Sequence, residues 1–159
     1  MAGNHESYLD PVAVGVACWR PLNYMAKEEL FANPLTFWFM SSLNCFPVKR
    51  DSADLSALKE GLKRLKSGKP LVIFPEGSRR FDGGPNEPQP GIGFLAAKSG
   101  VPVIPAFVKG TQEALPRGDK FIHPKKVIVF FGKQILIERG MPYQRIAQLI
   151  MDNIRHLSC

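Results

Sequence analysis

A histidine and an aspartate five positions apart, His5 and Asp10, are the pair in this sequence best suited to catalysis. A histidine oriented by a carboxylate is a general base for a hydroxyl group or a water molecule. On one continuous helix the two side chains would point roughly 140° apart, so they can meet only across a turn that leads into a helix. Asp10-Pro11 supplies that transition, because Asp favours the N-cap and Pro the first helical position. The alternative is that Asp10 only caps the helix and that His5 belongs to a frayed terminus.

Charged side chains also follow two short apolar runs, 45–48 and 71–74, that we expect to be strands. The carboxyl edge of a sheet is where α/β folds collect ligand-binding groups. Arginine is suited to bidentate phosphate binding, so two such clusters could converge on one anion beside the histidine. An Arg–Glu pair that only braces a turn is the structural alternative. The charged residues concerned are Lys49, Arg50, Glu76, Arg79 and Arg80.

Other patterns in the sequence do not support a catalytic or cofactor site. Residues 91–96 (GIGFLA) fit a loose dinucleotide-binding pattern, but they follow a proline-rich loop where a strand is required. No serine stands in a G-x-S-x-G nucleophile elbow. The three cysteines are widely spaced, which suggests a reducing compartment, and His123 and His156 lack partners at metal-ligand spacing. We therefore expect no metal site and no disulfide framework.

Along the sequence, the apolar pattern alternates between strand-like and helix-like segments. This predicts one α/β domain over residues 1–159, with a largely parallel or mixed sheet flanked by helices. The clearest helix has a stripe of leucines from Leu55 to Leu65, and we expect Ser52 to cap it and Gly68 to end it. The other expected helices are 11–19, 25–30, 34–43, 92–99 and 143–157, and the other expected strands are 45–48, 71–74, 101–108, 127–131 and 134–137.

Composition narrows the choice of partner. The net charge is +7 and 45% of the residues are hydrophobic, which favours an anionic partner such as a phosphorylated metabolite, a coenzyme or an anionic lipid surface. The basic stretches 59–69 and 117–126 lack the aromatic or zinc-finger motifs of nucleic-acid binding, so they are interpreted as solvated faces and no nucleic acid is expected. The sequence has no run of about 18 consecutive apolar residues, which is the length needed to span a bilayer.

Four blocks, in order, resemble the glycerolipid acyltransferase family that includes the 1-acyl-sn-glycerol-3-phosphate acyltransferases. They are residues 4–10 (NHESYLD), 46–50 (FPVKR), 74–79 (FPEGSR) and 101–105 (VPVIP). Residues 27–31 also fall where the family often carries a similar run. Together these blocks cover essentially the whole chain.

The resemblance implies an enzyme that moves a fatty acyl group from an acyl thioester to the free hydroxyl of 1-acyl-glycerol-3-phosphate, giving phosphatidate. It implies that His5 is the base and that Asp10 orients it, with no metal or redox cofactor. The donor would be acyl-CoA or acyl carrier protein, and the protein would bind peripherally at the cytoplasmic face of a membrane. The substrate-binding residues it implies are Lys49, Arg50, Glu76, Gly77, Ser78, Arg79 and Pro105.

Two departures from the family pattern bear on this expectation. Family members usually have a strand before the first block and often membrane-associating helices before that, and we expect this chain to lack them. Ser78 stands where threonine is commoner, and Arg80 replaces a small hydroxyl residue.

Two rival functions remain open at this point. One is a truncated relative that binds anionic phospholipid without catalysis, and the other is a hydrolase in which water replaces the lipid hydroxyl. The apolar run 31–46 is equally open, because it could line an acyl groove, rest on a bilayer or form a buried core helix.

Overall fold

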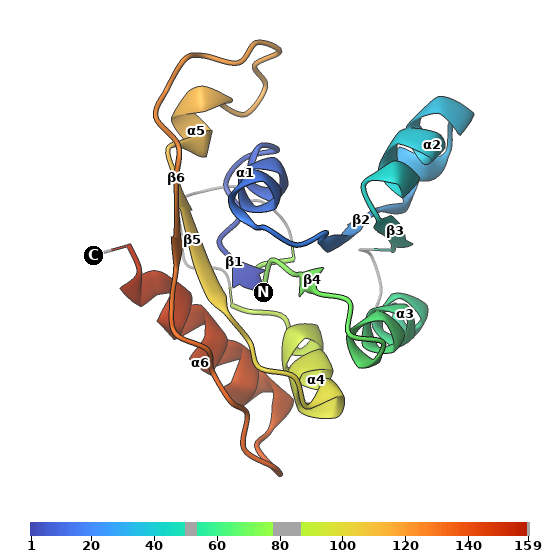
Figure 1. The fold of residues 1–159 in the computed structure, drawn as a ribbon, viewed down its shortest axis with the longest axis vertical. Coiled ribbons are helices and arrows are strands. Elements are labelled where there is room, and N and C mark those ends of the chain that lie inside the picture. The colour runs from blue at the N-terminus through green and yellow to red at the C-terminus, as the bar shows by residue number, and fades with distance from the viewer. Residues whose placement is uncertain (50–53, 78–86, 159) are drawn as a thin grey trace.

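Six short strands run through the centre of the computed structural model, which describes residues 1–49, 54–77 and 87–158 (Figure 1). Apolar and β-branched residues dominate most of them, as expected of strands that pack between helices. In chain order they are β1 (Ala2–Gly3), β2 (Asn23–Lys27), β3 (Cys45–Val48), β4 (Leu71–Val72), β5 (Pro105–Lys109) and β6 (Ile128–Phe131).

The strands pair as two three-stranded sheets, β1-β5-β6 and β3-β2-β4. A parallel bridge between Ala2 and Ile73 joins the two, which gives the order β6-β5-β1-β4-β2-β3. All pairings are parallel except that of β5 with β6 at one edge. The expected largely parallel or mixed sheet is therefore confirmed.

Helices flank the strands on two sides. The elements are α1 (Asp10–Ala17), η1 (Glu28–Phe31, a 3-10 helix), α2 (Pro34–Ser42), α3 (Leu55–Lys66), α4 (Pro90–Ser99), α5 (Thr111–Ala114) and α6 (Tyr143–His156). Alternate residues of β4 and its extension face opposite layers. Leu71 and Ile73 pack with residues of α3, α4 and α6, whereas Val72 packs with Val14 of α1.

Helices α4 and α6 lie side by side across one layer (Figure 1). Their contact depends on Gly93, because a Cβ atom there would lie 2.0 Å from the backbone oxygen of Tyr143. Both glycines of the 91–96 run lie inside helix α4, and Gly93 allows α6 to approach closely.

Several predictions are wrong. A strand does precede the first block, because β1 (Ala2–Gly3) comes directly before Asn4 and pairs with β5. Residues 25–30 are not one helix, because 25–27 belong to strand β2 and pair in parallel with β3, and 28–30 fall in the 3-10 helix η1.

The cap of α3 is Asp54, whose carboxylate accepts from the backbone N–H groups of Ser56 and Ala57, and the expected cap Ser52 lies outside the described residues. Leu55 is exposed and not part of the buried stripe. Of the alternatives left open for the apolar run 31–46, a buried core helix is excluded, because no residue of α2 is buried.

Within the described residues, no helix is both long enough and apolar enough to cross a bilayer.

Candidate active site

The structure brings His5 and Asp10 together. His5 Nδ1 lies 3.0 Å from Asp10 Oδ2, and both side chains are buried, with exposed fractions of 8% and 0%. Because Oδ2 is an acceptor, Nδ1 carries the ring proton and Nε2 presents its lone pair. Among the residues that the structure describes, none hydrogen-bonds to Nε2. This is the arrangement of a histidine base held in one tautomer by a carboxylate.

Asp10 holds the loop before α1 in place through four hydrogen bonds. Its Oδ2 also accepts from the backbone N–H groups of Glu6, at 2.6 Å, and Ser7, at 2.8 Å. Its Oδ1 accepts from the hydroxyl of Thr111, which lies 101 residues later in the chain. Asp10 is the first residue of α1, and its carboxylate turns back into the preceding loop. The sequence predicted Asp10 as the N-cap, but the N-cap is Leu9.

Asn4 explains why the chain leaves the sheet just before His5. Its side-chain Nδ2 donates to the Val108 carbonyl oxygen at 2.9 Å, and its Oδ1 accepts from the Val108 N–H at 2.7 Å. The side-chain amide thus takes the place of a backbone partner beside β5. Because the pairing is completed by a side chain, the backbone is released to turn toward α1 and His5 stands at the carboxyl end of β1.

The end of β4 forms the adjacent wall of the site. Phe74 stacks on the His5 ring, with centroids 4.3 Å apart and an interplanar angle of 21°. The turn that follows is closed by a hydrogen bond from Gly77 N to Phe74 O, and it requires Gly77 at a φ of +69°. Glu76, inside this turn, is buried. The carboxyl ends of β1, β4 and β5 therefore meet at His5, the edge at which α/β sheets bind ligands.

The other residues expected at the site divide into three groups. Lys49 is exposed, its Nζ lies 3.9 Å from Glu28, and it follows β3, three strands or about 14 Å across the sheet from β1. Pro105 lies opposite Ala2 at the other end of β5, three residues or about 10 Å along the strand from Val108, to which Asn4 bonds, so the structure does not bring it to His5. Arg50, Ser78 and Arg79 lie outside the described residues.

Sequence reasoning did not identify three residues that surround the histidine: Asn4, Phe74 and Thr111. Thr111 contacts Asp10 across 101 residues of sequence, so no local spacing could reveal the pair. The available signal was its place directly after a strand, following Gly110, whose φ of +91° turns the chain there.

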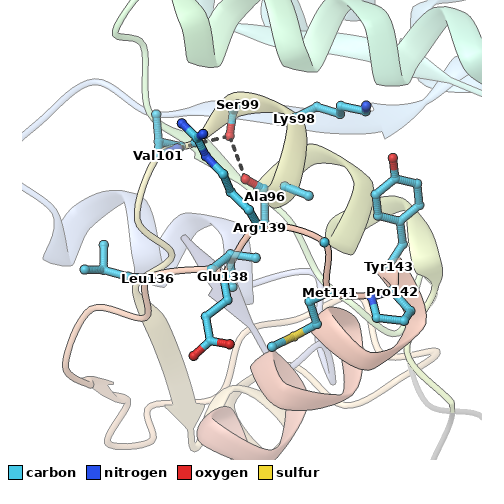
Figure 2. A pocket seen from close by; sticks show the side chains of 14 residues that line it. Ala96, Lys98, Ser99, Val101, Leu136, Glu138, Arg139, Met141, Pro142 and Tyr143 are labelled. Atoms are coloured by element: carbon cyan, nitrogen blue, oxygen red, sulfur yellow. Dashed lines mark hydrogen bonds between the residues drawn. The ribbon is translucent and has the colours of Figure 1, made fainter.

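Two cavities lie away from His5. One, of about 720 Å³, is lined by the end of α4 and by residues 136–143, and Figure 2 shows Lys98 and Arg139 among its lining side chains. The other, of about 390 Å³, lies at the amino ends of the central strands, beside Met1 and Leu71. Neither is lined by the His5–Asp10 pair. Across the described parts of the chain, no cluster of side chains is suited to hold a metal ion.

Comparisons with known proteins agree with this geometry. Residues 1–109 match the family model described as acyltransferase. A chloroplastic 1-acyl-sn-glycerol-3-phosphate acyltransferase of Brassica napus is 32% identical over 156 residues, covering 96% of this chain and 43% of the relative. The corresponding Bacillus subtilis protein is 32% identical over 111 residues, covering 69% of this chain and 55% of the relative.

A lyso-ornithine lipid O-acyltransferase of Pseudomonas aeruginosa is 26% identical over 156 residues and aligns with 92% of this chain and 57% of the relative. The crystal structure of the 1-acyl-sn-glycerophosphate acyltransferase PlsC from Thermotoga maritima superposes with a TM-score of 0.76 at 26% identity, covering 99% of this chain and 65% of that one. The chain thus spans about half the length of the curated relatives named here. With the site geometry and the family match over residues 1–109, these likenesses show that the chain belongs to the acyltransferase family.

Proposed function

We propose that this chain transfers a fatty acyl group from an acyl thioester to the free hydroxyl of 1-acyl-glycerol-3-phosphate, giving phosphatidate. The observation that carries the proposal is the His5–Asp10 contact of 3.0 Å, in which Nδ1 faces the carboxylate and Nε2 remains available. Family membership supports the reaction class. Several relatives are named for this reaction, which supports the choice of acceptor.

The proposed step needs one base and one nucleophile. His5 Nε2 takes the proton of the acceptor hydroxyl as its oxygen attacks the carbonyl carbon of the thioester. The carbon–sulfur bond then breaks, and the leaving thiolate takes the proton from the imidazolium. Asp10 stabilises the positive charge that the ring carries in between. No acyl-enzyme forms, and no metal or redox cofactor takes part.

The acceptor phosphate is assigned by resemblance to Arg50 and Arg79, with Lys49 adding positive potential. Guanidinium groups bind phosphate through paired charge-assisted hydrogen bonds. Gripping the phosphate places the hydroxyl at the base and turns a collision into a positioned encounter. Glu76, buried in the turn that follows Phe74, is proposed to bind a glycerol hydroxyl or to fix Arg79.

We further propose that the protein acts as a peripheral protein at the cytoplasmic face of a membrane. The acceptor is an amphiphile that resides in bilayers, and the net charge of +7 favours anionic lipid. The acyl donor is acyl-CoA or acyl carrier protein.

The test is thiol release from a long-chain acyl-CoA, or from an acyl carrier protein, with and without lysophosphatidate. We expect release to depend on the acceptor and to fall by at least ~10²-fold in His5→Ala, because a positioned general base contributes about that much. His156→Ala is the matched control, since His156 lies at the end of α6, where its ring bonds only to the Asp152 carbonyl oxygen of the same helix, and it should keep full activity.

Other outcomes would replace the proposal. Acceptor-independent release would indicate a hydrolase. A folded protein that binds phospholipid and releases no thiol from either donor would indicate a binding-only relative. Release that requires lyso-ornithine lipid in place of lysophosphatidate would move the acceptor to that of the Pseudomonas relative.

A further inference from the structure

Exposed apolar side chains stand on three elements, two of which, α1 and the loop 115–127, border the His5–Asp10 pair. Helix α1, helix α2 and the loop 115–127 lie along the upper side of the molecule in Figure 1, away from the start of α6 at the bottom. Each contributes two apolar side chains that are between 57% and 83% exposed. We call this set the apolar rim; it consists of Val12, Val16, Leu35, Trp38, Phe121 and Ile122.

The loop part of the rim is a built structure. Asp119 Oδ1 accepts from the backbone N–H groups of Lys120, at 2.7 Å, and Phe121, at 3.2 Å, and its Oδ2 lies 2.7 Å from His123 Nε2. The His123 N–H donates to the Ala114 carbonyl oxygen at 2.7 Å. These bonds hold the loop closed at its base with Phe121 and Ile122 at its tip. The apolar side chains of Phe121 and Ile122 are therefore exposed to solvent and do not pack into a hydrophobic core.

The charge of the same loop selects the partner. Four cations flank the tip, and the only carboxylate in the loop is bonded to His123. An apolar tip flanked in sequence by cations matches the boundary between the acyl chains and headgroups of an anionic bilayer. A second copy of this chain is disfavoured, because each copy carries a net charge of +7. The four cations are Arg117, Lys120, Lys125 and Lys126.

The rim is also joined to the site. The Ser7 hydroxyl donates to the Leu115 carbonyl oxygen at 3.0 Å, which ties the catalytic loop to the start of the loop 115–127. Asp10 begins α1, whose outer face carries Val12 and Val16 one turn apart. A bilayer against the rim would thus lie beside the histidine.

We propose that the apolar rim docks the protein on an anionic phospholipid bilayer, with Phe121 and Ile122 entering the headgroup boundary and Trp38 resting at it. The inference rests on the proposed function in that the acceptor is a bilayer lipid. It goes further by assigning the docking surface to these elements.

The first test is sedimentation of the full chain with vesicles of phosphatidylcholine alone or mixed with phosphatidylglycerol. Phe121→Ser combined with Ile122→Ser, and separately Lys125→Glu combined with Lys126→Glu, should each lower binding to the mixed vesicles at least tenfold. The matched controls lie at the other end of the molecule: Leu136→Ser, and Lys98→Glu combined with Arg139→Glu, should bind like the unmodified protein. Equal losses in rim and control variants would overturn the proposal.

The second test uses fluorescence, so that it does not depend on folding of the loop variants. The chain has two tryptophans, and Trp19→Phe leaves Trp38 as the only one. Its emission should shift to shorter wavelength on mixed vesicles and be quenched by brominated acyl chains. An unchanged emission from a protein that sediments with the vesicles would overturn docking through α2.

The failure of docking and the failure of catalysis are distinguishable. His5→Ala should bind vesicles fully, and the Phe121→Ser, Ile122→Ser protein should retain thiol release with acceptor supplied in detergent micelles. Vesicle binding without acyl transfer would contradict the proposed function alone. Acyl transfer with no rim-dependent binding, or a rim-dependent dimer in solution, would contradict the docking alone.

Discussion

At the scale of single residues, the site is a short loop held by hydrogen bonds from distant parts of the sequence. Asp10 receives donors from its own loop and from Thr111, and Asn4 is fixed on Val108. The spacing of His5 and Asp10 was enough to predict that the two meet across a turn. It was not enough to predict how, because the carboxylate bonds to the loop behind it and does not cap the helix in front.

Thr111 is expected to be a positioning residue for the proposed reaction. Thr111→Val keeps the shape of the buried side chain but removes the hydroxyl, which leaves Asp10 Oδ1 without that donor. If the loss of this buried hydrogen bond, about 1–3 kcal/mol, raises the reaction barrier by the same amount, kcat falls by roughly 5- to 150-fold. We expect KM for the acyl donor to stay unchanged.

Steady-state kinetics of Thr111→Val and Thr111→Ser provide the check. The serine variant keeps the hydroxyl and should restore kcat. If kcat falls and KM also changes in both variants, Thr111 acts only through the stability of the fold.

At the scale of elements, the strands and helices are set by pairing more than by local propensity. Residues 23–27 include good helix formers, yet they become β2 because two parallel neighbours satisfy their backbone groups. The apolar run of α2 left burial, an acyl groove and a bilayer surface open. The helix packs mainly against η1 and β3, and most of its large side chains are exposed, which excludes burial. The helices with one clear apolar face, α3 and α6, were predicted to within a few residues at each end.

The close approach of α4 to α6 gives a stability prediction. In Gly93→Ala the new Cβ meets the Tyr143 carbonyl oxygen, which is backbone and cannot rotate away. We expect a loss of at least about 1–3 kcal/mol in the free energy of unfolding, because the helices must separate. Urea denaturation followed by circular dichroism measures it.

Gly91→Ala is the matched control in the same helix. Its Cβ would meet only the tip of the Leu58 side chain, 3.3 Å away, so the free energy of unfolding should change by less than about 1 kcal/mol. Equal losses in the two variants would mean that α4 tolerates neither and that the contact with Tyr143 is not the cause.

Asp54 ties the end of β3 to the start of α3 and makes that connection acid-sensitive. The hydrogen bond from the Lys49 backbone N–H, with those from Ala57 and Ser56, holds the pKa of this carboxyl below its usual 3.8. Since the folded pKa is the lower one, its contribution to stability is present above pH 3.8 and is lost as the pH falls through the folded pKa.

The comparison variant is Asp54→Asn, which keeps a capping oxygen without the charge. We expect the unmodified protein to be more stable than Asp54→Asn at neutral pH, and the difference to shrink as the pH falls below 3.8. Thermal unfolding across that range measures it, and a difference independent of pH would contradict the assignment.

At the scale of the whole molecule, the order β6-β5-β1-β4-β2-β3 places the first strand of the sequence in the middle of the sheet. This arrangement could not be read from the sequence, because periodicity identifies strands but not their neighbours. The α/β class followed from the alternation of segments, and the meeting of blocks from separate strands followed from the general geometry of parallel sheets.

The central place of β1 has a consequence during synthesis of the chain. Asn4 binds Val108, which is 104 residues later, and ribosomes add about 5–20 residues per second, so the pair cannot form for roughly 5–20 s. Until then the loop that carries His5 has neither Asn4 anchored nor Asp10 bonded to Thr111. Such long-range pairing makes for slow folding, so the loop that carries His5 acquires its final shape only after the segment that contains Val108 and Thr111 has been made.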